Sequence, residues 1–112
     1  MFPAVLSLVL TLFVAADAPR PLPAYADALN CAGVTQAAVD GQEKGADTGK
    51  VFDSAIYWSM AAMEVARSTG MTAARAEQDQ KAARARYKAL LDEDDVDAWS
   101  DLAGCLKATP PL

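Results

Sequence analysis

The chain has 112 residues, which is enough for one domain, and its 10 Lys+Arg against 15 Asp+Glu give a formal net charge of −5. It contains no histidine and two cysteines. These counts exclude zinc or haem held by histidine, Ser–His and Cys–His nucleophile pairs, and four-cysteine metal sites. The acidic balance argues against nucleic acid as the main partner, since phosphate binding needs a basic face. We therefore expect a protein that is not an enzyme, with no metal and no cofactor.

The N-terminal residues 1–16 are predicted to be a cleaved signal peptide. Residues 4–16 carry no charge, are too few to cross a bilayer, and have the length of a secretory apolar region. The small residues Ala15 and Ala16 favour cleavage after Ala16, although cleavage after Ala18 also fits the small-residue rule. The prediction is a periplasmic or secreted protein without a stable membrane anchor. No basic residue precedes the apolar region, so a buried N-terminal helix of a cytosolic protein is the alternative.

Export gives the two cysteines a structural role. In an oxidising compartment an even number of cysteines in a small domain indicates a disulfide, and here the only intramolecular pair is Cys31–Cys105. A loop of about 74 residues would be closed, which the chain-entropy model values at about 4 kcal/mol. The alternative is two free thiols in a reducing cytosol.

The remaining chain is predicted to be all-α, a small four-helix bundle closed by this disulfide. Residues 17–23 contain Pro19, Pro21 and Pro23 and read as an extended lead-in. Helical periodicity, with Gly70 as a C-terminal cap residue and Thr72 as an N-cap, divides the domain 24–108 into helices. The expected helices cover residues 24–40, 51–68, 72–91 and 96–108, followed by a tail at 109–112.

The helix expected at 51–68 differs from the others because it is apolar nearly all round. One stripe holds Phe52, Ile56 and Met63, and a second holds Trp58, Ala61, Ala62 and Val65, with Tyr57 among polar neighbours. Such a helix is typical of the buried centre of a bundle. If its neighbours leave part of it uncovered, that part would bind a partner or a second copy. The candidate partner-binding residues are Tyr57, Trp58, Ala61, Ala62 and Val65, and the alternative is that Trp58 is plain core.

A second pattern spans residues 83–106. It consists of Ala83, Tyr87 and Leu90, then, after a turn, Trp99, Leu102, Ala103 and Leu106. This pattern resembles the seam between two tetratricopeptide repeats, where neighbouring helices pack small and aromatic residues together. The resemblance implies a tight helical hairpin rather than a peptide-binding array, which needs about three repeats. We expect the ring of Trp99 to anchor that hairpin in the core.

The most probable function from the sequence is a non-catalytic interaction with another protein, by a monomer or a homodimer. One version is an inhibitor or immunity-type protein whose acidic surface covers a basic partner. The alternative is a small periplasmic holdase of the acid-stress type, and a minor hydrolase is a third class. The acidic run at residues 92–101 is the densest charged feature, and helix capping accounts for it best.

Overall fold

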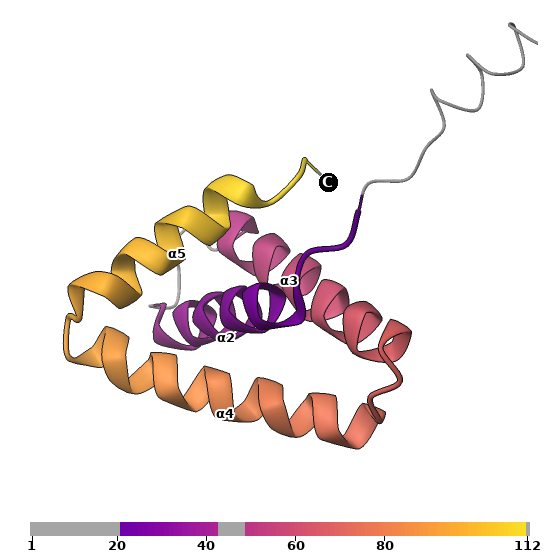
Figure 1. The fold of residues 1–112 in the computed structure, drawn as a ribbon. Coiled ribbons are helices and arrows are strands. Elements are labelled where there is room, and N and C mark those ends of the chain that lie inside the picture. The colour runs from indigo at the N-terminus through magenta and orange to yellow at the C-terminus, as the bar shows by residue number, and fades with distance from the viewer. Residues whose placement is uncertain (1–20, 43–48, 112) are drawn as a thin grey trace, which may run out of the picture.

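The computed structural model describes residues 21–42 and 49–111, and this part of the chain is all-helical, as the sequence predicted. The predicted signal peptide and the first residues of the lead-in, 17–20, lie outside the described residues. The helices are α2 (Tyr25–Gly41), α3 (Gly49–Ser68), α4 (Ala73–Asp92) and α5 (Val96–Ala108) (Figure 1). Their ends agree with the predicted ends within two residues. Residues 21–24 precede α2 without regular secondary structure, and Ala24 has extended dihedral angles.

The central helix is α2, which packs against all three of the others (Figure 1). Its buried positions hold small side chains, namely Ala28, Ala32, Gly33, Val34, Thr35 and Ala37. Small side chains on several faces let three neighbours approach one helix closely. The expectation that the helix at 51–68 forms the buried centre is therefore wrong. That helix, α3, covers one side of α2 and leaves part of its own surface in solvent.

The helices α2 and α4 approach each other closely at Gly33 of α2. A Cβ built on Gly33 would lie 2.7 Å from the Cβ of Ala83 on α4 and 2.8 Å from the carbonyl carbon of Ala83. Real Cβ atoms do not come so close, so this crossing requires glycine. The cost of glycine in a helix, about 1 kcal/mol, is thus offset here by tight packing.

The turn between α3 and α4 contains the residues that cap both helices. At the end of α3, Gly70 has φ 82°, and the N–H of Met71 donates to Ala66 O over 2.9 Å. This is a Schellman motif, which glycine adopts without strain. Thr72 then caps α4 by accepting from the N–H of Arg75. Both roles, of Gly70 and of Thr72, are those that the sequence predicted.

The predicted tight hairpin of α4 and α5 is wrong, because the two helices meet near their connecting turn, where Leu91 and Ala98 share a core cluster, and then diverge with α2 between them (Figure 1). The face of α5 that lies inward also differs from the predicted one. Ala98, Leu102 and Cys105 are buried, whereas Val96 is 80% and Trp99 46% exposed. The predicted anchoring by Trp99 is therefore wrong. The reason is the disulfide: Cys105 must face α2, and the residues three and seven positions before it share that face. Trp99 points about a quarter turn away from them.

Candidate functional site

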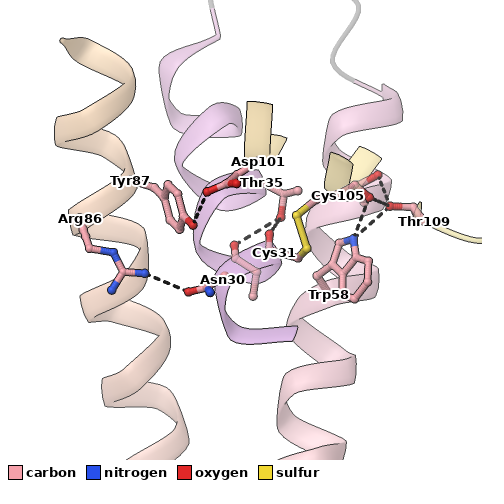
Figure 2. Close-up of a disulfide and its surroundings, with 11 residues drawn as sticks. Asn30, Cys31, Thr35, Trp58, Arg86, Tyr87, Asp101, Cys105 and Thr109 are labelled. Carbon is pink, nitrogen blue, oxygen red and sulfur yellow. Dashed lines mark hydrogen bonds between the residues drawn. A yellow bond between two sulfur atoms is a disulfide. The ribbon is translucent and has the colours of Figure 1, made fainter. Parts of the chain in front are cut away.

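The disulfide joins Cys31 of α2 to Cys105 of α5, with 5.5 Å between the two Cα atoms (Figure 2). This confirms the predicted pair. Cys105 belongs to a core cluster with Val34 of α2 and Tyr87 of α4. The bond therefore ties the last helix to the central one.

Trp58 lies directly beside the disulfide. Its indole N–H donates to Cys105 O over 3.2 Å and to Thr109 Oγ1 over 3.0 Å (Figure 2). Ser54 Oγ also donates to Thr109 Oγ1, at 2.9 Å. Trp58 is only 7% exposed, so it fastens the C-terminal end of α5 to α3. A buried indole with its N–H satisfied is a structural group.

The predicted partner-binding residues are thus divided by burial. Trp58, Ala62 and Val65 are buried, which leaves them out of reach of a partner in this structure. Tyr57 and Ala61 are half-buried, and the Tyr57 ring meets Trp58 edge-on with centroids 4.9 Å apart. This stripe faces inward because Trp58 and Ala62 pack in one core cluster with the alanines of α2, and α5 supplies hydrogen-bond acceptors for the Trp58 N–H.

The other stripe of α3 faces solvent. Phe52, Ile56 and Met60 follow each other at intervals of four residues and are 50%, 43% and 68% exposed. We call these three residues the α3 stripe. The sequence pattern placed Phe52 and Ile56 on one face without Met60, and the predicted partner-binding residues came from the other stripe. The spacing of four residues was the signal that could have found this face.

Two hollows flank the α3 stripe. The first, of about 320 Å³, lies toward α2 and α4 and is lined by all three stripe residues together with Val39. The second, of about 530 Å³, lies between Ile56 and Met60 and the lead-in, where Leu22 is 52% exposed. Large apolar side chains bordered by hollows are the feature expected of a surface that receives another protein's side chains.

Polar contacts fix the relative positions of α2, α3 and α4 around the α3 stripe. Gln36 Nε2 of α2 donates to Ser59 Oγ of α3 over 2.6 Å and to Gln80 Oε1 of α4 over 3.1 Å. Arg84 donates twice to the Asp40 carboxylate at the edge of the first hollow, and these hydrogen bonds lower the pKa of Asp40. Both groups of this pair are partly solvated, so its net contribution to stability is small.

A hydrogen bond at the edge of the core fixes the start of α2 against α4. The hydroxyl of Tyr25 donates to Asp79 Oδ2 over 2.9 Å. Burial, and then the hydrogen bond and negative charge of Asp79, raise the pKa of Tyr25 to about 12. The equivalent contact at the other end of α4 joins Tyr87 to Asp101 over 3.0 Å (Figure 2). Both contacts fix the relative position of helices.

Among residues 21–42 and 49–111, no group of three or more His, Cys, Asp or Glu side chains is placed to hold a metal ion. In the same ranges, no helix is both long and apolar enough to cross a membrane. No protein-family model, curated protein or solved structure matches this chain.

Proposed function

We propose that the protein is an exported, non-catalytic interaction protein that binds another protein through the α3 stripe. The observation that carries the proposal is the exposure of Phe52, Ile56 and Met60 in one row with a hollow on each side. Within residues 21–42 and 49–111 no other helix covers these side chains, because α2 and α5 lie on the opposite side of α3, so a partner could bury them. Burying a large apolar side chain contributes about 1.5–3 kcal/mol, so three of them suffice for a substantial interface core.

The signal-peptide pattern and the disulfide support the exported part of this proposal. Disulfides persist in oxidising compartments and are rare in the cytosol. The partner would then be a periplasmic or extracellular protein with a complementary row of apolar side chains. The chain's net charge of −5 favours a partner whose rim around that row is basic. In this version the protein acts as an inhibitor or immunity-type binder of one partner.

A small holdase is the second candidate, and Met60 is the observation that favours it. Met60 is 68% exposed and borders the hollows on both sides of the stripe. Methionine is flexible and polarizable, and such side chains are common on surfaces that accept many different apolar sequences. A holdase would prevent the aggregation of unrelated unfolded proteins, whereas an inhibitor would bind one folded protein with fixed stoichiometry.

Site-specific photo-crosslinking in the native host tests the proposal. A photoreactive amino acid at Ile56 should give one discrete crosslinked band if the protein binds one partner, and a smear if it is a holdase. The matched position is Val96 on α5, which is also apolar and 80% exposed but lies outside the stripe. Equal crosslinking at Ile56 and Val96, or none at either, would contradict a partner surface on α3.

A further inference from the structure

The three methionines of the described residues lie around one hollow. The chain has four methionines, and Met60, Met63 and Met71 all line a space of about 460 Å³ between α3 and α4. Ala66 of α3 and Ala73 and Ala76 of α4 complete its apolar lining. The small size of these alanines leaves the longer methionine side chains as the groups that can reach across the space.

Backbone geometry brings the three residues together. Met60 and Met63 are three positions apart on α3, where neighbouring Cβ atoms are about 5–6 Å apart. Met71 follows the turn, and its N–H donates to Ala66 O over 2.9 Å because Gly70 takes a positive φ of 82°. This Schellman motif folds the chain back, so that Met71 borders the same hollow as the last two turns of α3.

The amino-acid composition makes these thioethers the soft metal ligands of the described chain. There is no histidine, and both cysteines are joined in the disulfide. The methionines are therefore the soft donors that this chain can offer a metal. The sequence-based expectation of no metal considered imidazole, thiolate and carboxylate ligands and left thioethers aside. Thioether sulfur prefers Cu(I) to harder cations.

The charged residues at the rim are compatible with a cation. Glu64 and Arg67 both border the hollow, and Arg67 donates two hydrogen bonds to the Glu64 carboxylate. The carboxylate therefore neutralises the one cationic side chain of the lining, while the whole chain is acidic, with a net charge of −5. The carboxylate is engaged by Arg67, which leaves the thioether sulfurs as the soft donors of the lining.

We propose that Met60, Met63 and Met71 bind one Cu(I) ion through their three sulfur atoms. The alternative is that the three methionines only fill apolar space between the helices. That role explains Met60 poorly, because its side chain is 68% exposed and fills little of the interior. The methionine side chain is unbranched and flexible, so rotation about its Cα–Cβ and Cβ–Cγ bonds can turn each sulfur toward the hollow that the three residues line. The proposal does not depend on the protein partner of the α3 stripe, since only Met60 is shared.

Competition with a coloured Cu(I) chelator tests the proposal on the full, disulfide-bonded chain, under anaerobic conditions with ascorbate. The wild type should take up one equivalent of Cu(I), and the methyl resonances of Met60, Met63 and Met71 should shift together in ¹³C-methyl-methionine spectra. Each of Met60→Leu, Met63→Leu and Met71→Leu conserves side-chain volume but removes a sulfur. Each should weaken binding at least about tenfold, since even outer-shell changes often do so.

Ile56→Leu is the control, because it changes the neighbouring surface and keeps all three sulfurs. It should bind Cu(I) within about twofold of the wild type, and Zn(II) should shift none of the three methyl resonances. Circular dichroism of every variant checks that the helices are intact. The proposal is overturned if the wild type takes no Cu(I) from the chelator, or if the triple Met→Leu variant binds as tightly as the wild type.

Discussion

Gly33 of α2 and Ala83 of α4 are in such close contact that a Cβ on Gly33 would lie 2.7 Å from the Cβ of Ala83. The Ala83 carbonyl carbon and oxygen are nearly as close, at 2.8 and 3.0 Å. A flexible side chain could move aside, but a neighbouring backbone cannot without shifting α4. The distance between the two helices is therefore set by the absence of a side chain at position 33.

Gly33→Ala should consequently destabilise the protein although alanine is the better helix former. Overpacking of a tight contact costs about 1–3 kcal/mol, which exceeds the gain of about 1 kcal/mol in helix propensity. Gly104→Ala is the matched control, since nothing lies within 4 Å of a Cβ there and α5 should gain stability. Urea unfolding measures both. A Gly33→Ala variant as stable as Gly104→Ala would show that the helices separate at little cost.

Loss of the disulfide should be a major loss of stability. Cys31 and Cys105 are 74 positions apart, and closing a loop of that length contributes about 4 kcal/mol in the chain-entropy model. Cys105→Ala should therefore lower the free energy of unfolding by about 2–5 kcal/mol. Chemical denaturation of oxidised, reduced and variant protein measures the difference. Reduced wild type should resemble the variant, and unchanged stability after reduction would contradict this role.

The two tryptophans should differ sharply. Trp58→Ala should cost about 3–5 kcal/mol, because a buried ring and two hydrogen bonds to α5 are lost. Trp99 is 46% exposed, so Trp99→Ala should cost about 1 kcal/mol or less. Thermal unfolding of the two variants side by side checks the order. A larger loss of stability for Trp99→Ala than for Trp58→Ala would show that the Trp99 ring packs in the core, as the sequence pattern predicted and contrary to this structure.

Alkaline pH should weaken the attachment of α2 to α4. The raised pKa of Tyr25, about 12 against 10.0 for the free group, means that the folded state holds this proton more firmly than the unfolded chain. The stabilisation is fully present below pH 10 and is lost as the pH rises toward about 12. Tyr25→Phe should therefore flatten the dependence of the unfolding free energy on pH in this window.

Tyr57→Phe is the control for this measurement, since the Tyr57 hydroxyl takes no part in the contact between Tyr25 and Asp79. The informative quantity is the difference between variant and wild type in the slope of stability against pH, because this difference isolates the Tyr25 hydroxyl. If Tyr25→Phe keeps the wild-type slope, the hydroxyl of Tyr25 does not contribute to alkaline sensitivity.

The helix boundaries could be predicted because local residues determine them. Gly70, Thr72 and Asp95 mark turns and caps through backbone geometry and short-range hydrogen bonds, as the structure confirms for each. The disulfide could be predicted because two cysteines allow one pair. These features do not depend on which helices are neighbours, and for this reason they can be predicted from the sequence.

The packing could not be predicted because it depends on partners far away in the chain. The alanines of α2 give almost no apolar periodicity, yet their small size puts α2 in the centre. Trp58 is buried because Cys105 and Thr109 supply acceptors for its N–H, and Trp99 is exposed because Cys105 fixes the rotation of α5. The same arrangement leaves Phe52, Ile56 and Met60 exposed and buries Trp58, Ala62 and Val65.

The most direct test of a partner surface on α3 is affinity capture with the double variant Phe52→Ser/Ile56→Ser. Both side chains are about half exposed, so the double variant should lose about 1 kcal/mol of stability or less per site and stay folded. Val96→Ser, an exposed apolar change on α5, serves as the control. Our account predicts that the stripe variant loses the partner captured by the wild type while Val96→Ser retains it. Equal capture by a folded stripe variant would contradict the account.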